Sequence, residues 1–246
     1  NMWENISSEK TRSFIERHFG TKGKDTSGIS AKPAITLSRQ EGAGGLEVAS
    51  NLASYLETHT ASHEAWTVFS QHLVAKVLED HDYHKGIGDF MKEGHKGSLT
   101  DAFEEFLGLH PNTWTLVEKT NATIFRLAQI GNVILVGRGA NIVTGELQNV
   151  FHVHTVGSLE NRIERAQKVF NLDQKAATKY IKQKDKSRKR YVKDNFDKDM
   201  DDPLLYHVVI NTDLVKYDEA ARIIGNEVIA RFKLDKLPKV QKIGVV

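Results

Sequence analysis

Three glycines stand between a short apolar run and the start of a helical pattern. Ala34–Leu37 has the length of a buried strand, and Gly42, Gly44 and Gly45 follow it. A helical period then begins, with one face formed by Ala49, Leu52, Ala53 and Leu56. A strand, a glycine turn and a helix in this order point backbone N–H groups and the positive end of the helix at an anion, usually a phosphate. The stretch predicts either a phosphate-binding turn or a purely structural one.

The turn matches only part of the phosphate-loop pattern G-x-x-x-x-G-K-[ST]. Aligned on Gly44, the chain has Arg39 in place of the first glycine and Gly45 in place of the lysine. Glu47 stands where nucleoside monophosphate kinases usually place a magnesium-binding threonine. The lysine normally reaches the β- and γ-phosphates. Because arginine binds phosphate through two parallel hydrogen bonds, Arg39 or the distant Arg188 could replace it.

A second group of candidate residues follows the apolar run Val133–Val136. Such a continuous run is typical of a central strand in a parallel sheet. Ligands of open parallel sheets bind beyond the carboxyl ends of the strands, where Gly137, Arg138 and Gly139 would lie. We therefore expect Arg138 to contact the phosphate or base of an acceptor, rather than to be an ordinary surface arginine.

The charged run from Lys182 to Arg190 has two interpretations. It is either a solvated helix face or the lid of a phosphotransferase, whose cations close over the transferring phosphates. In the second interpretation Arg188 acts on the phosphates, and Lys184, Asp185 and Arg190 belong to the lid.

Two further patterns could suggest metal binding. His152 and His154 share one face of a predicted strand, but no third ligand is recognisable, so a helix-facing or solvent-facing role is expected. The acidic segment from Asp194 to Asp202 lacks the glycine and glutamate of a calcium loop. No residue is therefore assigned to a metal.

The elements that must position these residues alternate between strands and helices. Strands are predicted at 34–37, 66–69, 133–136, 150–155 and 206–210, and helices at 4–19, 70–79, 99–108, 113–129, 158–170 and 217–232. A further helix is predicted from Asp173 to Arg190, and Ser158 and Asp173 are expected to cap the helices that they begin. Residues 80–97 are expected to form a loop. In the helix 158–170 we expect Arg162 and Arg165 on the polar side, and in the last helix we expect Ile223 to pack inward. The alternation predicts an α/β fold with an open, parallel, five-stranded sheet.

Bulk composition narrows the classes of function. The 246 residues carry a net charge of +2, so no overall field argues for binding to nucleic acid or a membrane. There is no cysteine, which excludes disulfides and thiolate metal sites and fits a reducing cytoplasm. No apolar run approaches the ~18 residues of a membrane span.

Five segments together resemble the cytidylate kinase-like family, a branch of the nucleoside monophosphate kinases. They occur in the family's order: Ile35–Glu47, Val133–Ala140, Phe151–Arg162, Asp185–Tyr191 and Tyr206–Thr212. The resemblance implies a three-layer α/β/α fold of the P-loop kinase type. It also implies the strand order 2-3-1-4-5, a helical insertion on the acceptor side and a lid.

The resemblance also implies an activity, which is transfer of the γ-phosphoryl group of ATP, with Mg²⁺, to a nucleoside monophosphate such as CMP or dCMP. Gly42, Ala43, Gly44 and Gly45 would hold the donor phosphates, with Glu47 near the magnesium or at the first turn of the helix. Arg138 would hold the acceptor, and Arg188, with Lys184 or Arg190, would close from the lid.

Two departures from the family keep alternatives open. Leu46 replaces an arginine, and Gly139 replaces an aspartate that contacts the cytosine nucleotide. The alternatives are a non-catalytic nucleotide- or phosphate-binding module and a kinase of another small metabolite. We divide the chain into an N-terminal helix with a linker (1–32), the kinase-like domain (33–235) and a C-terminal tail (236–246). The N-terminal helix could pack on this domain or on a neighbouring chain, so either it or the tail could mediate a homo-oligomer.

Overall fold

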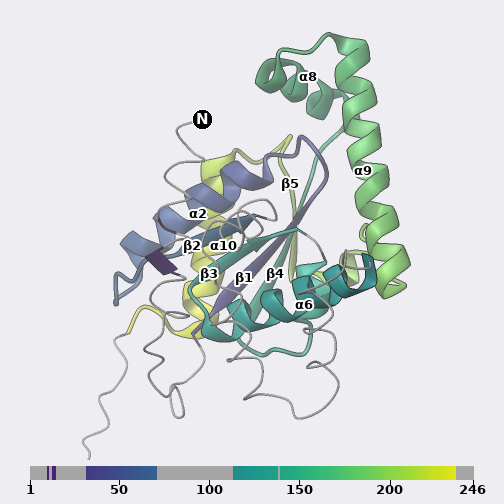
Figure 1. The fold of residues 1–246 in the computed structure, drawn as a ribbon. Coiled ribbons are helices and arrows are strands. Elements are labelled where there is room, and N and C mark those ends of the chain that lie inside the picture. The colour runs from purple at the N-terminus through teal and green to yellow at the C-terminus, as the bar shows by residue number, and fades with distance from the viewer. Residues whose placement is uncertain (1–9, 11–12, 15–31, 71–112, 138, 237–246) are drawn as a thin grey trace, which may run out of the picture.

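A computed structural model describes residues 10, 13–14, 32–70, 113–137 and 139–236. Within these residues, five strands form one sheet in the order β2-β3-β1-β4-β5, and every neighbouring pair is parallel (Figure 1). The strands are β1 (Ala34–Arg39), β2 (Thr67–Ser70), β3 (Val133–Val136), β4 (Val150–Val156) and β5 (Val208–Asn211). The predicted sheet and its strand order are confirmed, and β1 lies at the centre.

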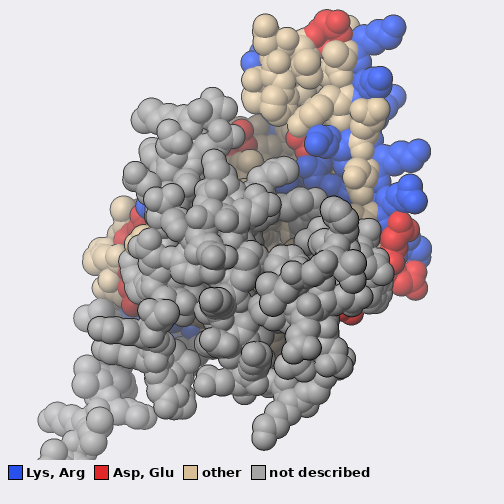
Figure 2. Space-filling model, viewed as in Figure 1, with Lys and Arg blue, Asp and Glu red and all other residues tan. Residues whose placement is uncertain are grey.

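Helices cover both faces of the sheet, as the three-layer prediction requires (Figure 1). They are α2 (Gly45–His59), α6 (Thr113–Ile130), α7 (Ala140–Val143), α8 (Leu159–Phe170), α9 (Gln174–Phe196) and α10 (Tyr217–Phe232), with a 3₁₀ turn at Pro203–Leu205. The α8–α9 pair projects beyond the sheet, and Lys and Arg gather along the outer edge of α9 (Figures 1 and 2).

The alternation of side chains along each strand produces two separate cores. In β1, Ile35 and Leu37 face α2 and α10, where they join a buried cluster with Leu52, Phe151 and Ile224. The opposite faces of β1 and β3 pack against α6 and α7, in a cluster that contains Ala34, Phe69, Leu127, Val133 and Leu135. Because β1 is buried on both faces, the position at which it ends is fixed by the packing.

Side-chain caps begin two of the predicted helices. The Ser158 hydroxyl accepts a hydrogen bond from the N–H of Asn161, and the Asp173 carboxylate accepts one from the N–H of Ala176. Both caps were predicted from the sequence and are confirmed. They fix where α8 and α9 start, and a small core containing Ala166 and Ile181 holds the two helices together.

Three sequence predictions differ from the structure. The fifth strand begins at Val208 instead of Tyr206, because the 3₁₀ turn takes the N–H of Tyr206 into a bond with the carbonyl of Pro203. Helix α9 continues beyond Arg190 to Phe196. Ile223 is 47% exposed, since Ala220, Ile224 and Val228 define the centre of the buried face and Ile223 lies at its rim.

The described part of the N-terminal helix packs on the kinase-like domain. Lys10 forms an ion pair with Glu57 of α2, at 2.8 Å. Phe14 is 5% exposed and meets Phe69 of β2 edge to face, with ring centroids 5.4 Å apart. Three further parts lie outside the described residues: the rest of this helix, the elements predicted between residues 70 and 112, and the tail from 237. Among the helices that the structure describes, none has both the length and the apolar character needed to cross a membrane.

Candidate functional site

The glycine turn joins β1 to α2 in a backbone conformation that favours glycine. Gly42 and Gly44 have φ values of +78° and +71°, and Gly44 is the N-cap residue of α2. A Cβ on Gly42 would lie 2.7 Å from the carbonyl oxygen of Arg162, and one on Gly44 would lie 2.1 Å from the ring of Tyr217. Both positions therefore require glycine for conformation and for space.

The turn presents hydrogen-bond donors at the positive end of α2. The N–H of Ala43 bonds to the carbonyl of Gln40, at 3.2 Å. The N–H groups of Gly42, Gly44 and Gly45 have no partner among the residues that the structure describes. The first N–H groups of a helix have no partner within the helix, so this arrangement suits an anion.

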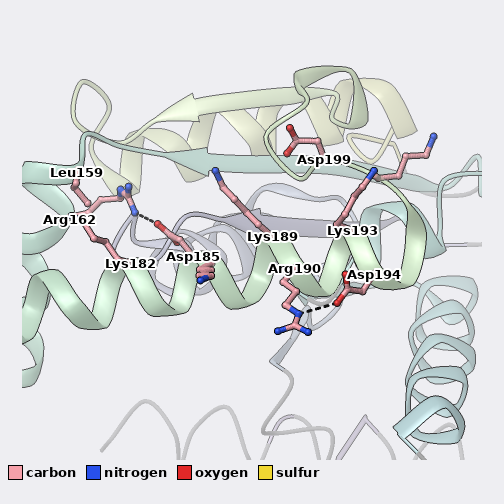
Figure 3. Close-up of a pocket in the computed structure, with 11 residues that line it drawn as sticks. Leu159, Arg162, Lys182, Asp185, Lys189, Arg190, Lys193, Asp194 and Asp199 are labelled. Atoms are coloured by element: carbon pink, nitrogen blue, oxygen red, sulfur yellow. Dashed lines mark hydrogen bonds and ion pairs between the residues drawn. The ribbon is translucent and has the colours of Figure 1, made fainter.

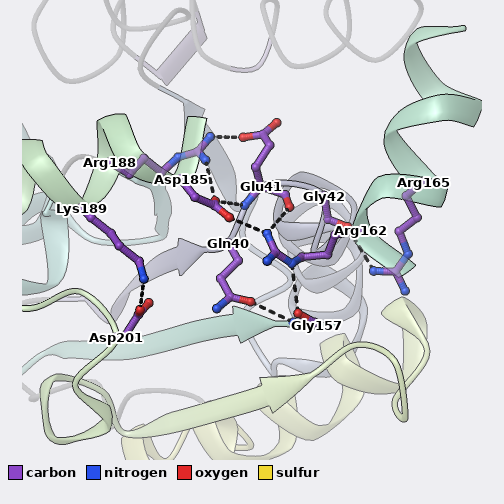
Figure 4. A network of polar contacts seen from close by, with 10 residues as sticks. All are labelled: Gln40, Glu41, Gly42, Gly157, Arg162, Arg165, Asp185, Arg188, Lys189 and Asp201. Atoms are coloured by element: carbon purple, nitrogen blue, oxygen red, sulfur yellow. Dashed lines mark hydrogen bonds and ion pairs between the residues drawn. The ribbon is translucent and has the colours of Figure 1, made fainter. Parts of the chain in front are cut away.

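Every polar group of Glu41, the residue before the turn, is bonded to α8 or α9 (Figure 4). Its N–H donates to Asp185 Oδ1 at 2.7 Å, and its carbonyl oxygen accepts from Arg162 Nη1 at 3.0 Å. Its carboxylate accepts a hydrogen bond from the Tyr180 hydroxyl at 3.2 Å and forms an ion pair with Arg188. Burial, followed by the negative charge of Glu41, raises the pKa of Tyr180. We call these five residues the Glu41 cluster.

The cluster brings together residues that the sequence placed in different roles. Asp185 and Arg188, predicted in the lid, do lie against the glycine-turn segment. Arg162 was expected on the polar side of α8, but it is only 7% exposed. It is buried because it forms an ion pair with Asp185, at 2.5 Å, and donates from Nε to the carbonyl of Gly157, at 3.0 Å.

Arg165 connects the glycine turn to the segment after β5. Its guanidinium donates to the carbonyl of Gly42 at 3.2 Å and to the carbonyl and hydroxyl of Thr212 at 2.8 and 3.1 Å. It also stands over the ring of Tyr217, 4.9 Å from the centroid. Burial raises the pKa of Tyr217, and the nearby Arg165 opposes that shift. Neither Arg165 nor Tyr217 was predicted from the sequence to belong to the site.

Arg39 lies between the ends of β1 and β3. Its Nη1 lies 2.0 Å from the position of a Cβ on Gly137, and its stem packs against Gly45. The guanidinium thus occupies the space that Gly137 leaves beyond the sheet. Arg138, the predicted acceptor-binding residue, lies outside the described residues.

Three predicted residues lie at the edge of this arrangement. Glu47 is exposed in the first turn of α2, where its charge suits the positive helix end. Lys184 is exposed with its ammonium group 5.6 Å from the Tyr180 ring centroid, and Arg190 is exposed and pairs with Asp194. In the described part of the chain, neither Lys184 nor Arg190 forms a hydrogen bond or an ion pair with the glycine turn. Leu46 is 51% exposed.

A groove of about 800 Å³ runs along α9 and begins beside the Glu41 cluster (Figure 3). Arg162 and Asp185 lie toward one end, and Asp194 and Asp199 lie toward the other (Figure 3). None of the four residues Gly42 to Gly45 lines it. Between the glycine turn and α9, Glu41 is in direct contact with Tyr180, Asp185 and Arg188.

The two predicted histidines are buried. His152 is 7% exposed, and its Nδ1 is hydrogen-bonded to the Thr36 hydroxyl at 2.8 Å. His154 is 2% exposed and stacks on Tyr206, with ring centroids 4.6 Å apart. Burial lowers the pKa of each to about 4. A solvent-facing position is excluded for both. No group of three metal-ligating side chains occurs in the part of the chain that the structure describes.

Comparisons with known proteins agree with this architecture. The model of the cytidylate kinase-like family matches residues 34–214. Among solved structures, an uncharacterized protein from Eubacterium ventriosum shares 21% sequence identity and a TM-score of 0.54, covering 80% of this chain and 98% of that one. At this identity the likeness concerns the fold alone. No curated protein matches the chain.

Proposed function

Because the chain belongs to the cytidylate kinase-like family, we propose that it transfers the γ-phosphoryl group of ATP to a nucleoside monophosphate, with CMP and dCMP as the first acceptors to test. The contact of Arg188 with Glu41, directly before the glycine turn, carries the proposal. It brings a cation from the predicted lid to the segment whose N–H groups would receive the donor phosphates.

The proposed roles follow from these positions. The N–H groups of Gly42, Gly44 and Gly45 would bind donor phosphate oxygens at the positive end of α2. Arg188 would exchange Glu41 for the transferring phosphoryl group and stabilise its charge. Arg39, at the ends of β1 and β3, supplies a positive charge near the position of the missing lysine. Arg138 would hold the acceptor.

Magnesium in this reaction neutralises charge on the donor phosphates when it is bound. It usually keeps several waters and takes only one or two carboxylates from the protein. Glu47 is exposed in the first turn of α2 and fits such a partial role, directly or through water. The residues present therefore fit a magnesium ion that arrives with the nucleotide.

The direct test is phosphoryl transfer from ATP with Mg²⁺ to a panel of CMP, dCMP, UMP, AMP and GMP, followed as ADP formation above ATP alone. We expect turnover on at least one acceptor and a loss of about 10²-fold or more in Arg188→Ala, typical for removing a transition-state cation. Arg222→Ala on the exposed face of α10 is the matched control. The Arg138→Ala variant should bind every accepted monophosphate more weakly, and unchanged binding would refute its assigned role.

A non-catalytic nucleotide-binding module is the second candidate. The Glu41 cluster favours it, because two carboxylates of the protein take the place that a phosphate would have. The Glu41 carboxylate is paired with Arg188, and the Asp185 carboxylate accepts a hydrogen bond from the N–H of Glu41, beside the turn. Tight binding of ATP without transfer to any acceptor would establish this alternative in place of the kinase.

A kinase of another small metabolite is the third candidate. Gly139 has a φ of +66°, and a Cβ there would lie 2.5 Å from the ring of Phe196. The aspartate that the family places at this position has no room in this arrangement. Transfer to a non-nucleotide acceptor, with none to the monophosphate panel, would favour this candidate.

A further inference from the structure

Positive charge in this protein is concentrated on one helix. Helix α9 carries nine Lys or Arg residues against two Asp, a net charge of +7. The whole chain carries +2, so the rest carries −5. The small overall charge therefore conceals a separation of charge, which Figure 2 shows as a blue edge along α9.

Four lysines form a line on the first half of α9, and we call them the lysine stripe: Lys175, Lys179, Lys182 and Lys186. Their spacing is i, i+4, i+7 and i+11. At 100° and 1.5 Å per residue, they lie within an arc of about 60° and extend over about 17 Å. All four are exposed.

The stripe is uncompensated, unlike the rest of the helix. None of its four lysines forms an ion pair with any residue that the structure describes, whereas Lys189, Arg190 and Lys193 pair with Asp201, Asp194 and Asp197. Like charges at i and i+4 repel each other, so the stripe does not stabilise α9. The opposite face of α9 is buried through Ala177 and Ile181, so the helix that carries the stripe is packed against the rest of the protein.

Two shallow hollows accompany the lysines. A hollow of about 630 Å³ includes Lys175, Lys179 and Thr178. The groove of Figure 3 includes Lys182 and Lys186. Asp173 also lines the first hollow, but its carboxylate accepts the capping bond from the N–H of Ala176. The surface thus offers cations along one line, beside two shallow hollows.

The residue types in the stripe favour one class of anionic partner over the others. Protein interfaces depend on an apolar core, and the stripe contains no apolar or aromatic residue. Membrane-surface helices insert an apolar face, and that face of α9 is already buried in the protein. Single-stranded nucleic acids are bound through aromatic stacking platforms, which the stripe lacks. A duplex needs neither, since its closely spaced phosphates release counterions to any line of cations.

We propose that the lysine stripe binds the phosphate backbone of duplex nucleic acid without reading its base sequence. The proposal is independent of the kinase activity, because none of the four lysines belongs to the Glu41 cluster or has a role in the proposed phosphoryl transfer. With four cations, we expect a Kd of roughly 10⁻⁵ M at low salt, and a slope of log K against log salt of about −3.6.

The test is fluorescence anisotropy of a labelled duplex of about 20 base pairs with the full chain, at 50 to 200 mM salt and without nucleotide. Lys175→Gln/Lys179→Gln/Lys182→Gln should weaken binding at least tenfold and reduce the slope to about −1. The matched control removes three exposed lysines outside α9, in Lys216→Gln/Lys233→Gln/Lys236→Gln. It should change binding less than twofold, and two duplexes of unrelated sequence should bind equally.

Three results would overturn the proposal. One is the absence of duplex binding by the wild-type chain at 50 mM salt. The second is an equal loss in the two triple variants, which would show that only bulk charge matters. The third is binding to anionic vesicles or polyglutamate as tight as to the duplex, with the same dependence on the stripe. Thermal unfolding of both variants verifies that each is folded.

Discussion

Glu41 shows how a single residue can combine two opposite roles at an anion site. Its backbone ties the glycine turn to α8 and α9, while its carboxylate occupies the arginine that a phosphate would need. The side chains of Glu41 and Arg188 are 15% and 24% exposed, so water only partly screens their attraction. A phosphate must therefore displace a carboxylate before Arg188 can act on it.

Replacing that carboxylate should favour nucleotide binding. In Glu41→Gln the backbone contacts remain, but Arg188 is released and a repelling charge disappears. We expect ATP to bind several-fold more tightly by calorimetry, with a loss of stability of about 1–2 kcal/mol from the broken pair. Glu64→Gln, which breaks an ion pair with Lys32 at the other end of the sheet, is the control. Weaker ATP binding in Glu41→Gln would mean that Glu41 positions Arg188 and does not compete for it.

Burial of His154 makes the free energy of unfolding depend on pH. Both ring nitrogens lack a hydrogen-bond partner among the described residues, and burial lowers the pKa to about 4 from the usual 6.5. As the pH falls below 6.5, the unfolded chain binds the proton first. The stability contributed by the neutral ring is complete above about pH 7 and is lost between pH 6.5 and 4, about 3 kcal/mol at most.

A leucine at this position should therefore reduce the acid sensitivity. His154→Leu should lose about 2 kcal/mol less than wild type between pH 7.5 and pH 5, measured by urea unfolding. The exposed His63, changed to Asn, should keep the wild-type dependence. Equal curves for wild type and His154→Leu would contradict the assignment.

At the scale of elements, the glycine turn depends on packing from α10 as well as on backbone conformation. Gly44→Ala places a methyl group against the ring of Tyr217 at a positive φ. We expect a loss of about 2 kcal/mol or more and at least tenfold weaker ATP binding, measured by thermal unfolding and calorimetry. Gly145→Ala is the control, since its Cβ would be 3.3 Å from the nearest atom and its φ is not positive. If Gly44→Ala behaved like Gly145→Ala, the turn would not need its glycine.

The sequence predicted elements better than it predicted partners. Continuous apolar runs indicated β1 and β3, and the caps Ser158 and Asp173 indicated where α8 and α9 begin, because these signals are local. The burial of Arg162 depends on Asp185, in another helix, and on Glu41, 121 positions earlier. No period or motif reports such a contact. Glu41 was missed for the same reason, since it lies in the unassigned part of the turn.

At the scale of the whole molecule, the strand order came from the resemblance to a family, and the sheet confirms it. The residue pattern alone predicted a parallel sheet, because alternating strands and helices allow few other arrangements. The two possible positions of the N-terminal helix could not be separated by its apolar stripe. In the described residues, Phe14 contacts Phe69 of its own chain.

That contact should contribute measurably to the stability of the kinase-like domain. Phe14→Ala removes a nearly buried ring and should cost about 2–4 kcal/mol in thermal or urea unfolding. Phe170→Ala is the control, because that ring is 48% exposed on α8 and should cost less. A negligible effect of Phe14→Ala would place the N-terminal helix elsewhere in solution.

Helix α9 has one face on the glycine turn and another in solvent, and it is a single rigid element of 23 residues. A polyanion held on the outer face and a nucleotide bound at the inner face would therefore act on the same body. Thermodynamic reciprocity then requires that any factor by which one ligand alters the affinity of the other operates equally in both directions. One helix would then respond both to a nucleotide bound at its inner face and to a polyanion bound at its outer face.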